Sequence, residues 1–199
     1  MSKTLKESPK VLGLDVSTRT IGWALFDIQS RDLLELTHFS PKIKPKPEDK
    51  LTEMMAKVDQ FKEKMVDYKN VGITKIVIEE PLINSNNIRT VAILMRYNSF
   101  ITRVIYDVLG ILPEYISTYD SRKFAFPTLY VPNNKGKKVL FGGYDKGCDK
   151  KHIVWEKVST KEPHLTWMYT RNNTLKKENY DMCDAYTCVL GQMSKSEIW

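Results

Sequence analysis

Two short apolar runs of this chain each end in a carboxylate, and they constrain the fold more than any other feature. The first is Val11-Leu12-Gly13-Leu14, followed by Asp15; the second, within 73–79, is Ile76-Val77-Ile78, followed by Glu79. A continuous apolar run predicts a strand buried on both faces. Because open α/β sheets bind ligands at the carboxyl ends of such strands, Asp15 and Glu79 are candidate functional residues. A lone aspartate is also a common turn former, and Glu80 competes with Glu79, since adjacent strand residues face opposite sides.

The other periodicities complete a mixed α/β pattern. Strand-like runs with short turns at the start of the chain predict an antiparallel meander, and apolar residues at three- and four-residue spacing predict amphipathic helices. Gly110 is placed to end the longest helix. The order predicts a mixed sheet flanked by helices in a single domain, residues 1–199. Beyond the first strand, we expect strands at 21–26, 33–39, 73–79 and 115–117, and helices at 51–68, 88–109, 151–158 and 180–190, with a further helix that Ser121 could cap.

The positive charge is concentrated in one segment. The chain has 31 Lys and Arg against 24 Asp and Glu, a net charge of +7, and residues 121–180 hold 13 basic against 5 acidic residues. A basic segment on a near-neutral body is typical of proteins that bind nucleic acid, although a solvated lysine-rich loop has the same composition. Within the segment, residues 126–150 are rich in Pro, Gly, Asn and Lys, and Val139 to Phe141 predicts one arm of a small hairpin. We therefore interpret 126–150 as a basic loop insertion.

A second pair of carboxylates lies near the other end of the sequence. Asp181 and Asp184 are three residues apart, so a helix presents both on one face, and the residues that follow are mostly apolar. A polar helix face is the ordinary explanation for such a pair. However, burial of an uncompensated carboxylate beside an apolar core costs free energy, which favours a functional role for the two aspartates. If this helix crosses the sheet edge, the pair meets Asp15 and Glu79. Four carboxylates repel one another unless hard divalent cations bind, and two such ions can activate a water and stabilise the leaving oxygen of a phosphodiester.

Composition excludes several classes of protein. Apolar residues make up 42% and charged residues 28%, which are ordinary globular values. No stretch approaches the roughly 18 apolar residues of a membrane span, and residues 1–10 contain no apolar signal segment. The three cysteines, Cys148, Cys183 and Cys188, are too few and too irregularly spaced for a disulfide framework or a zinc site. We expect a protein of a reducing compartment, cytoplasmic or nucleoid-associated, with no membrane partner.

Taken together, these residues resemble the motifs of RuvC-type Holliday-junction resolvases in the RNase H-like superfamily. The resemblance covers nearly the whole chain and implies an RNase H-like mixed five-stranded sheet flanked by helices. It selects Glu79 over Glu80 and implies a divalent-metal-dependent endonuclease with two Mg²⁺ or Mn²⁺ ions per site, held by Asp15, Glu79, Asp181 and Asp184. The matching segments are Val11 to Ser17 with Ile21-Gly22-Trp23-Ala24, Ile76 to Glu79, and Tyr180 to Ala185.

The resemblance also implies partners. The expected substrate is branched DNA, a four-way junction nicked symmetrically by a homodimer, and helix 88–109 is either the dimer interface or a fully buried central helix. Loop 81–87 lacks the aromatic residue common in the family, so Leu82 or Ile83 is a smaller apolar wedge or a buried anchor. Lys150 and Lys151 lie where this family tends to place a lysine that contacts a phosphate before a helix. For either residue, a solvated surface position is an equally good interpretation. The candidate DNA-binding residues are Arg89, Lys135, Lys137, Lys138, Lys150 and Lys151.

Three other functions are compatible with parts of this pattern. The same metal site would serve a nuclease acting on RNA–DNA hybrids or on other branched DNA. A kinase or ATPase of the actin and sugar-kinase superfamily shares a Gly-x-Asp first hairpin, but it needs two such domains and a second phosphate loop, which 199 residues with nine glycines do not supply. A non-catalytic junction-binding protein would not require four carboxylates.

Overall fold

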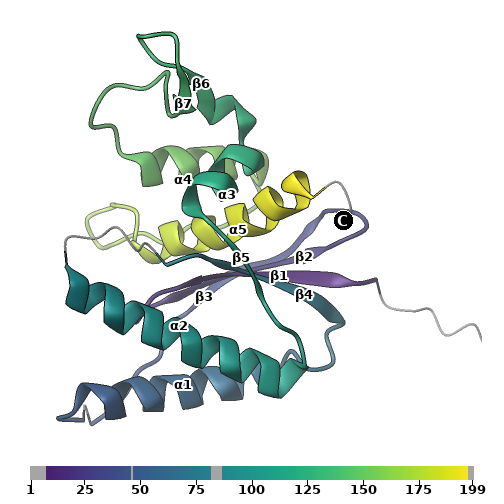
Figure 1. Cartoon of the computed structure of the whole chain (residues 1–199), viewed down its shortest axis with the longest axis vertical. Helices are drawn as coiled ribbons and strands as arrows, with labels where there is room; N and C mark the ends of the chain where they lie inside the picture. The colour runs from purple at the N-terminus through teal and green to yellow at the C-terminus, as the bar shows by residue number, and fades with distance from the viewer. Residues whose placement is uncertain (1–7, 46, 82–86, 197–199) are drawn as a thin grey trace, which may run out of the picture.

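A computed structural model describes residues 8–45, 47–81 and 87–196 as a five-stranded sheet with helices on both faces (Figure 1). The order in the sheet is β3-β2-β1-β4-β5. The first three strands form the predicted antiparallel meander, and β4 and β5 run parallel to β1. The predicted fold class, a mixed sheet flanked by helices, is confirmed. The strands are β1 (Lys10–Val16), β2 (Ile21–Asp27), β3 (Leu33–Phe39), β4 (Ile73–Glu79) and β5 (Glu114–Ile116).

Two amphipathic helices cover one face of the sheet. Helix α1 (Lys50–Val66) begins at Asp49, whose carboxylate accepts a hydrogen bond from the Thr52 amide, and α2 (Ile88–Leu109) ends at Gly110, which has a left-handed φ of 71°. Their apolar faces enclose the fully buried Trp23 in one core. Burial of these apolar stripes is the main stabilising contribution on this face.

The opposite face is covered by α5 (Glu178–Lys195), which packs against α3 (Thr118–Ala125) and α4 (Lys150–Lys161). Glycines let the α5 backbone approach the sheet closely. A Cβ atom on Gly22 of β2 would lie 1.9 Å from the Asp181 carbonyl oxygen, and one on Gly13 of β1 would lie 2.4 Å from that of Ala185. Helix α5 therefore rests on strand backbone, which fixes where its carboxylates lie.

Residues 126–150, named here the hairpin lobe, form a folded projection from this second layer (Figure 1). The short helix η1 (Pro127–Leu129) leads into β6 (Tyr130–Pro132), which pairs antiparallel with β7 (Lys138–Leu140). The predicted hairpin arm is thus confirmed. Buried Leu129 and Phe141 join the core under α5, so the segment is an anchored lobe and not an irregular solvated loop.

Two local predictions need correction. Helix α3 begins at Thr118 and is capped by Ser117, whose side chain accepts from the Asp120 amide; Ser121 lies one turn inside the helix and donates to the Thr118 carbonyl. The cap comes earlier because β5 ends at Ile116 and Ser117 already has the extended backbone that a cap requires.

The alternative of a fully buried helix at 88–109 is also wrong. Helix α2 buries Tyr97, Ile101 and Ile105, but Ile88 and Met95 in its N-terminal half are exposed. Its role as a dimer interface stays a prediction. In the part of the chain that the structure describes, no helix is both long enough and apolar enough to span a membrane. The three cysteines are free thiols, and Cys183 and Cys188 are buried.

Candidate metal centre

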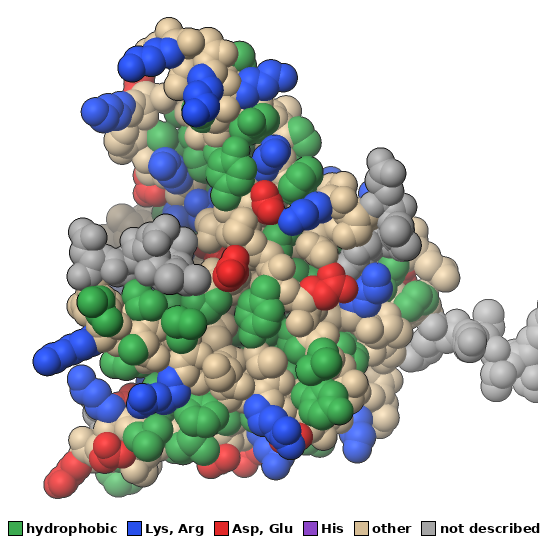
Figure 2. Space-filling model, in the orientation of Figure 1, with side chains coloured by type: hydrophobic (Ala, Val, Ile, Leu, Met, Phe, Trp, Pro, Cys, Tyr) green, Lys and Arg blue, Asp and Glu red, His purple; other side chains and the backbone are tan. Residues whose placement is uncertain are grey.

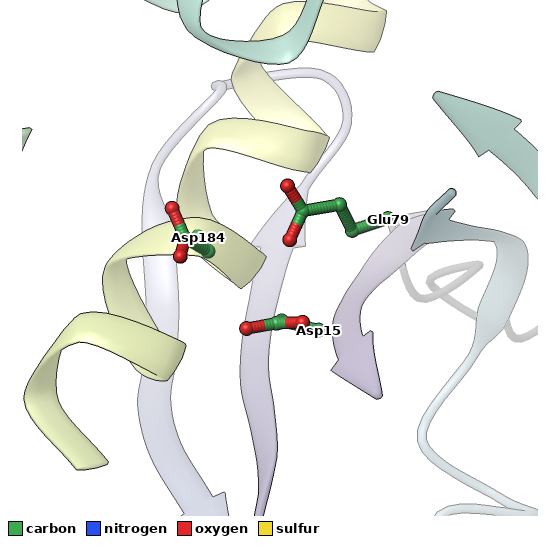
Figure 3. A group of neighbouring side chains, drawn as sticks. All are labelled: Asp15, Glu79 and Asp184. Carbon is green, nitrogen blue, oxygen red and sulfur yellow. The ribbon is translucent and has the colours of Figure 1, made fainter. Parts of the chain in front are cut away.

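Three carboxylates converge at one edge of the sheet. Asp15 lies near the end of β1, Glu79 is the last residue of β4, and Asp184 is on α5, and their side chains point toward one another (Figure 3). One carboxylate oxygen from each residue lies within 4.8 Å of the other two. Glu80, by contrast, is exposed and outside this group. The structure therefore brings together three of the four predicted ligands, with Glu79 and not Glu80 among them.

Strand register and helix packing produce this convergence. Strands β1 and β4 are parallel with Leu14 opposite Ile78, so Asp15 and Glu79, the next residues of each strand, reach the same edge. Asp184 comes from the other direction, on the helix that rests against Gly22. Gly22 pairs with Asp15 across β1 and β2, so the close approach of α5 occurs beside the carboxylate cluster.

Asp181 lies one helical turn before Asp184 and outside the three-oxygen group. It lines the same cavity of about 320 Å³ as Asp15, Glu79 and Asp184. One of its carboxylate oxygens lies 3.7 Å from the Lys151 ammonium. Asp181, the fourth predicted ligand, thus lies at the border of the centre, next to Lys151.

Two cations hold Asp184 from both sides. The Arg122 guanidinium donates to Asp184 Oδ1 at 2.8 Å, and Lys151 Nζ lies 3.0 Å from Oδ2. The Arg122 side chain is only 9% exposed, and its Nε has no hydrogen-bond partner in the described structure. Arg122 was not predicted, because an arginine on a short helix in a basic segment resembles surface charge.

Three acidic side chains at this edge of the sheet, Asp15, Glu79 and Asp181, have raised pKa values. Burial, followed by the charges of Glu79 and Asp184, raises the pKa of Asp15 well above its usual value. Burial and the Asp184 charge also raise the pKa of Glu79, and burial raises the pKa of Asp181 to about 6. Burial opposes the charged form of Lys151, but the Asp184 carboxylate more than offsets this and raises the Lys151 pKa. A divalent cation would relieve the repulsion, and carboxylate oxygens are the ligands that Mg²⁺ and Mn²⁺ prefer.

The predicted DNA-binding residues are spread over three places. Lys151 is at the carboxylate centre, Lys150 is exposed beside it at the start of α4, and Arg89 is exposed in the first turn of α2. Figure 2 shows Lys and Arg side chains gathered around the hairpin lobe. Lys135, Lys137 and Lys138 lie in this lobe and are exposed, and they form no salt bridge within the described ranges. Leu82 and Ile83 lie outside the described residues.

No known family model matches the chain, and no curated protein resembles it in sequence. Two solved structures of the RuvC protein from Thermus thermophilus are similar in fold. The first, in complex with a Holliday junction substrate, has a TM-score of 0.58 at 9% identity and covers 91% of this chain and 92% of its own. The second has a TM-score of 0.54 at 10% identity and covers 91% and 93%. At this identity the likeness establishes the fold alone: a mixed sheet flanked by helices, matching the RNase H-like fold of RuvC.

Proposed function

We propose that this protein is a divalent-metal-dependent endonuclease that cuts branched DNA and resolves four-way junctions by paired symmetric nicks. One observation carries the proposal: Asp15, Glu79 and Asp184 present oxygens within 4.8 Å of one another. The RuvC-like fold around them and the basic hairpin lobe support the same substrate class. In this proposal residues 1–199 act as a single nuclease domain in which the lobe is a basic insertion.

Each residue of the centre has a role in this proposal. Asp15, Glu79 and Asp184 would hold two Mg²⁺ or Mn²⁺ ions, and Asp181 would complete the ligand set. The bound ions would supply an activated water and stabilise the leaving oxygen of the phosphodiester. Arg122, which donates to Asp184, would orient that carboxylate. Lys151, 48% exposed at its side chain, would turn its charge to the substrate phosphate.

DNA contacts and assembly complete the proposal. The lysines of the hairpin lobe, together with Arg89, Lys150 and Lys151, would hold the phosphate backbones. Two symmetric nicks require two active sites, which a C2 dimer supplies most simply. The exposed apolar residues of α2, Ile88, Ile93 and Met95, are the candidate interface. Sedimentation should then show a dimer at micromolar concentration or on addition of junction DNA; a persistent 23.1 kDa species would exclude symmetric resolution by this route.

A cleavage panel tests the activity. The substrates are a four-way junction, a Y-fork, linear duplex, single strand and RNA–DNA hybrid, each with Mg²⁺, Mn²⁺ or EDTA. We expect metal-dependent cutting of the four-way junction in preference to the other substrates. Preferred cutting of the hybrid or the fork would replace the junction assignment, and tight binding without any cutting would make the protein a non-catalytic binder.

Charge-neutral substitutions test the ligand assignment in the same assay. Removal of one ligand weakens metal capture and phosphate activation together, so cleavage should be nearly abolished while DNA binding persists. Glu80→Gln is the matched control, because Glu80 follows Glu79 and lines the same cavity but is exposed and outside the three-oxygen group. An inactive Glu80→Gln beside an active Glu79→Gln would reverse the assignment. The four variants are Asp15→Asn, Glu79→Gln, Asp181→Asn and Asp184→Asn.

A further inference from the structure

Three aromatic side chains surround a lysine on the side of α3 that faces the hairpin lobe. The Lys123 ammonium lies 4.8 Å from the ring centroid of Tyr130, 5.1 Å from that of Phe124 and 5.8 Å from that of Tyr119. The Tyr119 and Tyr130 rings meet edge to face, with centroids 6.4 Å apart. We name this group, Tyr119, Lys123, Phe124 and Tyr130, the aromatic platform.

The fold does not use Tyr119 for its core. Its side chain is 46% exposed, whereas neighbouring Phe126 and Leu129 are buried in the core under α5. The backbone around it is nevertheless fixed. Ser117 caps α3, β6 pairs with β7, and a Cβ atom on Gly191 of α5 would lie 2.6 Å from the Ser121 carbonyl oxygen. An exposed aromatic surface on rigid elements is suited to binding, because little conformational entropy is lost when a ligand stacks on it.

The aromatic platform is also close to the carboxylate centre. Arg122, the residue before Lys123, points inward and donates to Asp184, so one short stretch of α3 carries Tyr119 and Lys123 of the platform together with a residue that contacts the centre. Tyr119 precedes Arg122 by three residues, about 4.5 Å along the helix axis. A helix with its side chains is only about 10–12 Å across. A strand passing the carboxylates would therefore reach the platform within a few nucleotides, at about 3.4 Å per nucleotide.

The surrounding charge identifies the class of ligand. Lys123 forms no ion pair within the described residues, and the same is true of Lys135, Lys137 and Lys138 in the hairpin lobe. Aromatic rings interleaved with uncompensated lysines match nucleic acid, whose bases stack on the rings while its phosphates pair with the cations. Paired bases inside a duplex offer no free face to such a ring, so the matching ligand is an unpaired base.

We propose that the aromatic platform is a binding site for an unpaired nucleobase of a strand that passes the carboxylate centre. The base stacks on the exposed ring of Tyr119, which Tyr130 contacts edge to face, and the Lys123 ammonium moves from the rings to the adjoining phosphate. A cation over an exposed ring is held weakly, so this exchange is feasible. The site is separate from the metal ligands, and it rests on the proposed function only in taking DNA as the polymer.

A binding titration without metal tests the site independently of cleavage. The probe is a single-stranded oligonucleotide carrying 2-aminopurine, titrated with the full chain in EDTA at several salt concentrations. Loss of one stacked base costs roughly tenfold in affinity, so Tyr119→Ala should bind about tenfold more weakly, while Tyr119→Phe stays close to wild type. The slope of log affinity against log salt should be unchanged in Tyr119→Ala and smaller by about 0.7 in Lys123→Ala, which loses one phosphate contact.

Tyr106→Ala is the matched control. Tyr106 is 45% exposed and has the Arg103 guanidinium 5.9 Å from its ring centroid, but it lies on α2, on the opposite face of the sheet. The control should bind like wild type. Wild-type affinity in Tyr119→Ala, or an equal loss in Tyr106→Ala, would overturn the proposal.

The two proposals fail in different ways. If no substrate is cut but Tyr119→Ala still loses binding, the nuclease proposal fails and the aromatic platform stands. If wild type cuts and Tyr119→Ala binds and cuts normally, the aromatic platform fails and the nuclease proposal stands. Thermal melting of each variant verifies that it is folded, and Tyr119→Leu, which keeps an apolar side chain but removes the ring, replaces Tyr119→Ala wherever that variant proves unstable.

Discussion

Gly22→Ala should damage the carboxylate centre far more than it damages the fold. The added Cβ atom would lie 1.9 Å from the Asp181 carbonyl oxygen and 2.4 Å from its carbonyl carbon, whereas ordinary contact begins near 3.4 Å. The start of α5 must therefore retreat from β2 by about 1.5 Å, which follows from those two distances. Asp181 and Asp184 move with it, away from Asp15, which pairs with Gly22 across the strands.

The expected losses follow from that displacement. A misplacement of about 1 Å can cost two orders of magnitude in rate, so single-turnover cleavage should fall at least about 100-fold. Mn²⁺ affinity, measured by calorimetry, should fall as well, because the ligand oxygens no longer meet. Overpacking of this size costs about 1–3 kcal/mol of stability, a loss that a folded domain can tolerate.

Gly142→Ala provides the comparison. Its Cβ atom would lie 2.2 Å from the Val131 carbonyl oxygen, a clash of similar severity that is confined to the hairpin lobe. It should lower the melting temperature comparably and leave Mn²⁺ affinity intact. The reasoning would be refuted if Gly22→Ala bound Mn²⁺ and cleaved within threefold of wild type, or if both variants lost metal affinity equally.

Three further predictions concern charge. Because the pKa values of Asp15 and Asp181 are raised on folding, the native state holds more protons than the unfolded chain, and the unfolding free energy of the metal-free protein should fall as pH rises from about 4 to 7. Urea unfolding should show that Asp181 contributes up to about 2 kcal/mol to this fall in unfolding free energy, allowing for its partial exposure. Saturating Mg²⁺ should suppress the fall. An unfolding free energy that rises with pH over this range would contradict the raised pKa values. Arg122→Met should destabilise the metal-free protein by about 3 kcal/mol, because it leaves Asp184 buried without its closest cation. The loss of stability should be smaller with Mg²⁺ bound. An equal loss in both conditions would mean that Arg122 acts only through packing. Replacement of Lys135, Lys137 and Lys138 in the hairpin lobe with alanine should reduce the slope of log affinity against log salt by at least a unit, at roughly 0.9 per duplex phosphate contact. An unchanged slope would place the DNA elsewhere.

The elements that could be predicted are those in which the pattern of apolar residues along the sequence shows directly which positions are buried. The run before Asp15 and the run before Glu79 are buried on both faces, so each is apolar at every position and identifies its strand end. Asp181 and Asp184 could be paired because the helix period alone puts them on one face. The fold class followed from these elements and their order.

The features that were missed depend on contacts between distant segments. Arg122 is 62 residues away from Asp184, and neither residue shows a pattern that reports the pair. The separation of Asp181 from the three-oxygen group likewise depends on how α5 is rotated on the sheet, which Gly22 and Gly13 control through contacts with its backbone. Single glycines in strands weaken a strand prediction, and they do not reveal which helix will occupy the space they leave.

The order in which the ligands occur along the chain also bears on how the protein is made. Asp15 and Glu79 leave the ribosome early, with the strands that carry them, but Asp184 arrives on α5, after every strand of the sheet. Until α5 docks, the face of the sheet that includes Ala24 and Phe26 has no cover from that helix. A nascent chain in that state has two carboxylates and an exposed apolar surface, which chaperones can bind. The group of three carboxylates is complete only when α5 has been synthesised and has docked, so an unfinished chain lacks the candidate metal centre.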